Sequence, residues 1–149
     1  MTGGLCGVTL GVVLLASVAC GGRGSPTGPS GTPVDLTGTW AGSATDSSGP
    51  GTMRWEVSQS GLSFRGTLLL ADVATGVSGR GAVSGTSSSQ GVTFSAEVAA
   101  GGFDGAYGAC SANVSGQATV SGASLTGTYS GTNSCSGLIS AGQFTLSRQ

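Results

Sequence analysis

Few residues of this chain of 149 could carry out acid–base or nucleophilic chemistry. Histidine is absent and the five basic residues are all arginines, so neither histidine nor lysine is available as a general base. Glu56 and Glu97 occupy outward-pointing positions of expected strands, and no neighbour would activate the many serines as nucleophiles. We therefore predict a protein that is not an enzyme, with no catalytic residue and no cofactor.

The two cysteines beyond the export segment, Cys110 and Cys135, have a more definite chemistry. A hairpin turn at Gly122-Ala123, with glycine first as a type II′ turn requires, places them directly opposite each other on neighbouring strands. Cα atoms at such positions are close enough for a disulfide. The alternative is metal ligation by two thiols without histidine, which has less support, so we predict a disulfide worth about 3–4 kcal/mol and no metal site.

Three aspartates, Asp46, Asp72 and Asp104, fall in loops between expected strands. Alternate loops of a meander barrel lie at the same end, so these aspartates and the loop around Cys135 should gather at one end, which we call the long-loop end. Their spacing lacks the regularity of a calcium-binding loop, which again predicts no metal site.

One of these loops, residues 100–108, is the candidate contact for a ligand or partner. It combines Phe103 and Tyr107 with Asp104 on a glycine-rich frame. Binding residues concentrate on such loops, although a merely solvated loop remains the alternative.

Strands must position all of these residues. Apolar and polar residues alternate with period two in eight segments separated by turn signals, and no segment has helical period. The segments are 36–45, 51–59, 62–70, 77–85, 91–99, 110–120, 124–131 and 139–148. Short connections predict an all-β fold, an eight-stranded antiparallel up-and-down meander barrel with one disulfide, since closure removes exposed sheet edges.

Turn positions predict three hairpin registers in which a large ring faces a glycine and covers its bare backbone. A turn at Ser60-Gly61 would pair Val57 with Phe64, Trp55 with Gly66, and Glu56 with Arg65 as an outward ion pair. The Gly122-Ala123 turn would pair Val120 with Leu125, Ala118 with Gly127, and Gly116 with Tyr129. A loop at 86–90 would pair Val83 with Val92 and Gly81 with Phe94.

The residues expected to face inward are almost all apolar: Leu36, Trp40, Met53, Trp55, Val57, Phe64, Leu68, Val83, Phe94, Val98, Val114, Tyr129, Phe144 and Leu146. An eight-stranded barrel can either fill its interior with side chains or hold one small ligand. The sequence leaves a filled core and a small apolar cavity both open.

An export segment precedes the barrel. The apolar run Val8 to Val18 suits a signal peptide, and Ala16-Ser17-Val18-Ala19-Cys20 resembles a bacterial lipobox, which implies cleavage after residue 19 and lipidation of Cys20. An ordinary secretory signal is the alternative. Residues 20–34 have the composition of a flexible tether, and residues 35–149 form the predicted barrel domain. Because Gly21 is not aspartate, the resemblance implies the outer membrane or the cell surface.

Asp35-Leu36-Thr37-Gly38-Thr39-Trp40 and Leu125-Thr126-Gly127-Thr128-Tyr129 resemble strands of streptavidin-type proteins. Together with the late Arg148, the Gly38-Thr39-Trp40 stretch is similar to the calycin superfamily of lipocalins and avidins. The resemblance implies a calycin-like barrel whose floor is closed by Gly38, Trp40 and Arg148. With only two tryptophans, the aromatic biotin box of avidins is not supported, and no ligand residue is carried over.

Charged residues make up 7% of the chain and the net charge is −1, so no basic face exists for nucleic acid. We predict a non-enzymatic, membrane-anchored lipoprotein of the bacterial cell envelope. Its barrel would bind a small apolar ligand or an envelope protein at the long-loop end. The alternative is a structural or protective envelope module, or a barrel-type protease inhibitor.

Overall fold

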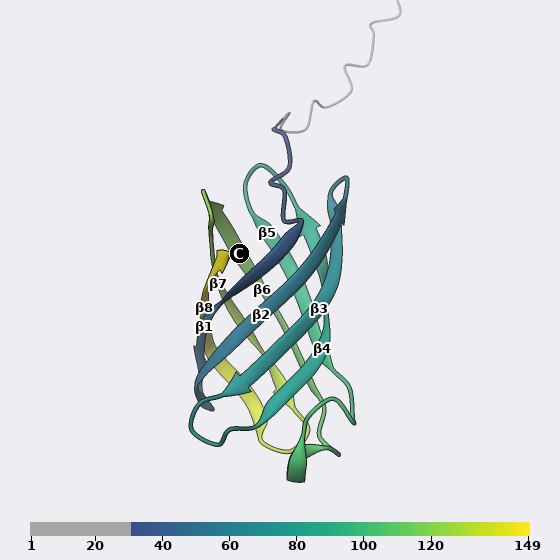
Figure 1. Cartoon of the computed structure of the whole chain (residues 1–149), viewed down its shortest axis with the longest axis vertical. Coiled ribbons are helices and arrows are strands. Elements are labelled where there is room, and N and C mark those ends of the chain that lie inside the picture. Colours follow the sequence, from purple (N-terminus) through teal and green to yellow (C-terminus); the bar gives the residue numbers. More distant parts are fainter. Residues whose placement is uncertain (1–30) are drawn as a thin grey trace, which may run out of the picture.

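The computed structural model describes residues 31–149, which form a closed barrel of eight antiparallel strands (Figure 1). Each strand is hydrogen-bonded to the next along the chain, and the first pairs with the last. The strands are β1 Gly38–Asp46, β2 Gly49–Ser60, β3 Ser63–Asp72, β4 Ser78–Ser87, β5 Val92–Val98, β6 Ala112–Ser121, β7 Ser124–Asn133 and β8 Gly137–Arg148. The predicted fold class and strand order are confirmed. The signal segment, Cys20 and the tether as far as residue 30 lie outside the described residues.

The barrel has two unlike ends. Short turns at 61–62, 88–91 and 122–123 lie at the end where the chain enters β1, which we call the entry end. The connections 47–48, 73–77, 99–111 and 134–136 lie at the long-loop end (Figure 1). Within 99–111 the 3-10 turn η1 spans Gly105–Tyr107, and no helix in residues 31–149 is long and apolar enough to cross a membrane.

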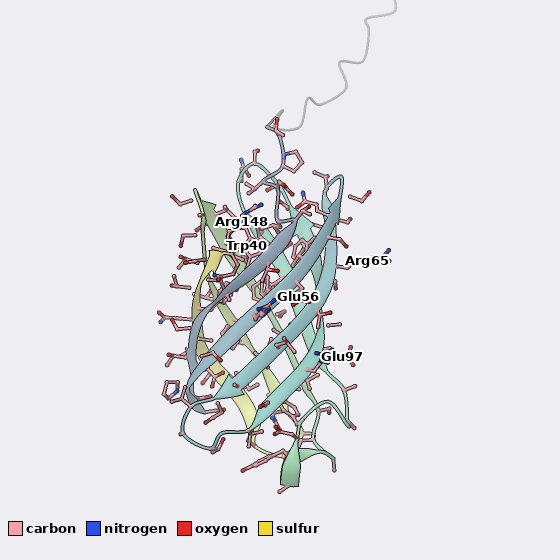
Figure 2. All side chains as sticks on the ribbon, in the orientation of Figure 1. Trp40, Glu56, Arg65, Glu97 and Arg148 are labelled. Carbon is pink, nitrogen blue, oxygen red and sulfur yellow. A yellow bond between two sulfur atoms is a disulfide. The ribbon has the colours of Figure 1, made fainter. Side chains whose placement is uncertain are left out.

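Alternation along the strands separates a buried inner face from an exposed outer face. Every residue expected to face inward is buried except Val114, which is half-buried against the core. Figure 2 shows Arg65 and Glu97 on the outer surface, away from this core. The hydrophobic pattern was therefore sufficient to assign the two faces.

Two of the three predicted registers are wrong in their partners. The Gly122-Ala123 hairpin is confirmed, but Val57 pairs with Gly66 and Val83 pairs with Ala96. The β2–β3 turn is centred on Gly61-Leu62, because the first central position of this turn has a positive φ, +60° at Gly61. Both errors shift the partner by an even number of residues, so the inner and outer faces are unchanged.

The β4–β5 hairpin also differs from the expected loop at 86–90. Pairing continues to Ser87 opposite Val92, and the remaining turn is closed by the Ser88 side chain, which donates to the Gly91 carbonyl at 3.1 Å. The Ser88 amide also donates to the Gly91 carbonyl, at 2.9 Å, so a four-residue turn, 88–91, joins the strands, and β4 ends at Ser87 instead of at residue 85 as predicted.

The expected ion pair between Glu56 and Arg65 does not form. In the observed register Glu56 lies opposite Thr67, and its carboxylate instead accepts a hydrogen bond from Arg54 of the same strand at 2.8 Å. Both side chains are about half exposed. Such a surface pair contributes little to stability.

Large rings do cover inward glycines. Tyr129 lies opposite Gly116 as predicted, although its ring covers Gly142, and the other two predicted pairs are wrong. Trp55 faces Trp40 and Leu68 rather than a glycine. Ring-on-glycine pairs between strands are Phe64 on Gly85, Phe94 on Gly116, Phe144 on Gly127 and Tyr129 on Gly142, and Phe103 of the 99–111 loop covers Gly79; an added Cβ would lie 2.5–2.8 Å from a ring carbon. A side chain at any of these glycines would displace the ring that covers it.

Cys110 and Cys135 form the predicted disulfide, with Cα atoms 5.6 Å apart. It joins the 99–111 loop to the 134–136 loop. Next to it, the Ser134 amide donates to the Ser111 carbonyl at 2.8 Å, and the Ser111 amide donates to the Ser134 hydroxyl at 2.9 Å. Two of the four connections at the long-loop end are thus held together.

Candidate ligand-binding cavity

The entry end of the barrel is closed by the segment that leads into β1. Leu36 is fully buried, and the carbonyl of Val34 accepts hydrogen bonds from Ser87 Oγ at 2.6 Å and Gln59 Nε2 at 3.1 Å. Val34, expected at the end of the tether, is therefore held against the barrel. Gly38 has φ +121°, a conformation that favours glycine, where this segment turns into β1.

Trp40 and Arg148 pack together at this end (Figure 2). The Arg148 guanidinium lies 4.6 Å from the centroid of the fully buried Trp40 ring and donates to the carbonyls of Thr37 and Asp35. Trp40 Nε1 donates to the Leu36 carbonyl at 2.8 Å. The residues named by the calycin resemblance thus share one end of the barrel, with their hydrogen-bonding groups used in closing it.

The long-loop half of the barrel contains a cavity of about 510 Å³. Its wall is mainly apolar and includes Met53, Leu68, Leu70, Ala96, Val98 and Ile139, with Trp55 and Phe94 also lining it. Small residues, among them Ala44, Gly79 and Ala112, leave the space that larger side chains fill at the entry end. A filled core and an apolar cavity, left open by the sequence, therefore occur in different halves of the same barrel.

The candidate loop contributes two of its three predicted residues to this cavity. Phe103 and Tyr107 line it, with Phe103 half-buried over Gly79 and Tyr107 43% exposed at the rim. Asp104 instead fastens the loop to β4, because its carboxylate accepts from the Ser78 amide at 2.8 Å and its own amide donates to the Ser78 carbonyl at 3.0 Å.

The three aspartates expected in loops do not converge on one point: Asp46 and Asp72 are the last residues of β1 and β3, and Asp104 lies in the 99–111 loop. Asp72 Oδ1 accepts from the amides of Thr75 and Ala74, each at 2.8 Å, and the Thr75 amide is the main cause of the lowered pKa of Asp72. Within residues 31–149 no three potential metal ligands lie together. Asp72 and Asp104 therefore serve mainly to shape their own loops.

Asp46 lines the cavity, and its carboxylate is hydrogen-bonded to the side chain of Tyr129, which also lines it. Its Oδ2 accepts from the Tyr129 hydroxyl at 2.8 Å, and its Oδ1 accepts from the Ser48 amide at 2.7 Å. Burial, together with the hydrogen bond to Asp46, raises the pKa of Tyr129 well above its ordinary value, so Tyr129 is a neutral donor. The sequence indicated an inward Tyr129 hydroxyl, and a buried hydroxyl needs a partner, but it did not identify Asp46.

Trp55 lines the cavity and carries a hydrogen-bond donor that has no partner within residues 31–149. It is fully buried, with the rings of Phe94 at 5.0 Å and Phe144 at 5.3 Å between centroids. Its Nε1 has no hydrogen-bond partner within residues 31–149, and it is the one buried side-chain nitrogen or oxygen there in that condition. Buried donors are normally paired, so this group needs an explanation that the sequence did not suggest.

In comparisons with known proteins, no family model, curated protein or solved structure matches this chain. The similarity to calycins remains a prediction that rests on the motifs around Trp40, Tyr129 and Arg148.

Proposed function

We propose that this protein is a non-enzymatic binding lipoprotein that holds one small apolar molecule in the long-loop half of its barrel. The observation that carries the proposal is the apolar cavity of about 510 Å³, which falls within the usual range of roughly 300–1,000 Å³ for small-molecule sites. A mostly apolar wall with a few placed polar groups is typical of such sites.

The two ends of the barrel support a particular orientation. The chain enters at the closed end, so lipidation at Cys20 would attach the membrane on that side. The cavity would then open away from the lipid surface. We propose the bacterial cell envelope, at the outer membrane or cell surface, as the location.

Binding can be tested with N-phenyl-1-naphthylamine, an uncharged apolar dye that becomes fluorescent in apolar surroundings. We expect saturable binding of one dye per chain. Ala96 lines the cavity, so Ala96→Phe should place a ring in it and weaken binding by about tenfold or more, a loss of roughly 1.4 kcal/mol.

Ala82→Phe is the matched control. Ala82 lies on the neighbouring strand β4 but is exposed on the outer face, so the same substitution there should leave dye binding within about twofold of the wild type. Thermal unfolding of both variants checks that each remains folded. No saturable binding by the wild-type protein, or equal loss in both variants, would contradict the proposal.

A protein partner at the same end is the second candidate. Val73 and Tyr107, on two connections of the long-loop end, and Leu138, near the start of β8 at the same end, are 66%, 43% and 72% exposed. Exposed apolar side chains at one site favour protein contact. A barrel-type protease inhibitor would be one form of this function. Binding through the rim should survive Ala96→Phe and be lost on trimming Tyr107 and Leu138 to alanine, which separates it from binding inside the cavity.

A further inference from the structure

The charges around the cavity have one sign. The charged residues among those lining it are Asp46 and Asp72. Arg54, Arg65 and Arg80 are exposed on the outer face of β2, β3 and β4, and Arg148 lies at the entry end (Figure 2). An anionic ligand would therefore find no cation in the cavity wall described here and would meet negative charge at the mouth.

Asp46 is the carboxylate placed to hold a ligand. One of its oxygens accepts from the Ser48 amide and the other from Tyr129, which leaves further lone pairs free, because a carboxylate offers about four acceptor positions. Asp46 is half-buried, so a charged hydrogen bond to it is less weakened by water than one on the surface. Asp72 also accepts two hydrogen bonds, but both come from backbone amides of the adjoining loop, whereas Asp46 is bonded to Tyr129, a side chain that lines the cavity.

Trp55 places a hydrogen-bond donor in the interior of the barrel, whereas Asp46 and Asp72 are acceptors. Its indole N–H is fully buried and has no hydrogen-bond partner within residues 31–149, and Trp55 is one of the residues that line the cavity. An ammonium group that entered deeply would exchange water for a wall of mostly apolar side chains, away from the carboxylates at the mouth. A ligand with one donor group therefore has its lowest energy with that group at Asp46 and its apolar body towards Trp55.

We infer that the cavity selects apolar molecules that carry a hydrogen-bond donor at the end that reaches Asp46. An ammonium group is preferred, an uncharged hydroxyl group is second, and carboxylates are disfavoured. This inference rests on the proposed function and adds to it the chemical class of the ligand. Asp46 would be the residue that determines specificity, with Tyr129 holding its carboxylate in place.

The test compares decylamine, decanol and decanoate, used below their micelle concentrations at pH 7, as competitors of N-phenyl-1-naphthylamine. At this pH the amine is cationic and the acid is anionic. We expect decylamine to displace the dye at about tenfold lower concentration than decanoate, since the amine can make a hydrogen bond between charged groups at Asp46 and the carboxylate cannot. Decanol should displace the dye at a concentration between those of decylamine and decanoate.

Two isosteric variants locate the selectivity. Asp46→Asn keeps an oxygen for the Ser48 amide and a polar partner for Tyr129, and should abolish the advantage of decylamine. Asp104→Asn removes one negative charge from the same end, at a residue that does not line the cavity, and keeps the oxygen that accepts from the Ser78 amide, so it should retain most of that advantage.

The outcomes separate the two proposals. If neither the dye nor any of the three compounds binds, the proposed function fails and this inference fails with it. If all three compounds compete equally, if decanoate competes best, or if both variants lose the selectivity alike, the cavity binds apolar molecules but the role of Asp46 is refuted. The head-group series on the wild-type protein decides this even if a variant does not fold.

Discussion

Breaking the disulfide between Cys110 and Cys135 should lower the stability of the barrel without changing its strand order. The bond joins two loops at the cavity rim, whereas each of the eight strands is hydrogen-bonded along its length to two neighbours. Its main effect is therefore expected on the unfolded chain, whose conformational freedom it restricts.

The magnitude follows from the length of the loop that the bond closes. The two cysteines are 25 residues apart, and in the chain-entropy model a loop of this length corresponds to about 3.5 kcal/mol at 25 °C. For a domain of this size, 1 kcal/mol shifts the melting temperature by roughly 3–5 °C, so reduction should lower it by about 10–18 °C.

The assay is thermal unfolding of the wild-type protein followed by circular dichroism, with and without a reductant, and of Cys110→Ala/Cys135→Ala. The free energy of unfolding of the double variant in oxidising buffer should match that of the reduced wild type to within about 1 kcal/mol. The small difference is expected because Cys110 is buried and alanine buries less side-chain surface there. Reductant should not affect the variant. Equal melting temperatures for oxidised and reduced wild type would show that the bond does not restrict the unfolded chain as argued.

Three further outcomes are expected. Because the pKa of Tyr129 is raised in the folded protein, its contribution to the free energy of unfolding is complete below pH about 10 and is lost as the pH rises above that value. Tyr129→Phe should lower the free energy of unfolding by about 1–2 kcal/mol at pH 7, and in urea unfolding the variant's free energy should decline less steeply above pH 10 than that of the wild type. Ala141, exposed with φ +54°, is strained, so Ala141→Gly should stabilise the protein by about 0.5–1 kcal/mol, and a loss of stability in urea unfolding would contradict this. Cys20→Ser should move the protein from the membrane fraction to the soluble fraction of a bacterial host; retention in the membrane would count against the lipid anchor.

The two hairpins with Ser-Gly-X-Ser turns show how far turn chemistry predicts a register. Residues 60–63 and 121–124 have the same pattern, and in both the glycine takes the first central position with a φ near +60°. Applying the rule used at Gly122 to Gly61 would have given the observed pairing. The error had no effect on the faces, because strand side chains alternate with period two and the shift was even.

The cavity could not be predicted in the same way. Whether the interior is filled depends on which inward residues share a level of the barrel, and that requires the registers of all strand pairs together. Ala44, Gly79 and Ala96 come from three different strands, and only the closed barrel brings them into one wall. The Asp46–Tyr129 contact likewise joins residues 83 apart in the chain, which no local pattern encodes.

The closed entry end limits where a ligand can come from. Trp40 and Leu36 are fully buried there, and Arg148 covers Trp40. A tether with the length proposed here would reach on the order of 20 Å, and it would leave from that same closed end. A molecule dissolved in the membrane to which the protein is anchored would then have no direct path into the cavity. The ligand would enter from the aqueous side, and a charged ammonium group at Asp46 would make an otherwise apolar molecule soluble enough to arrive by that route.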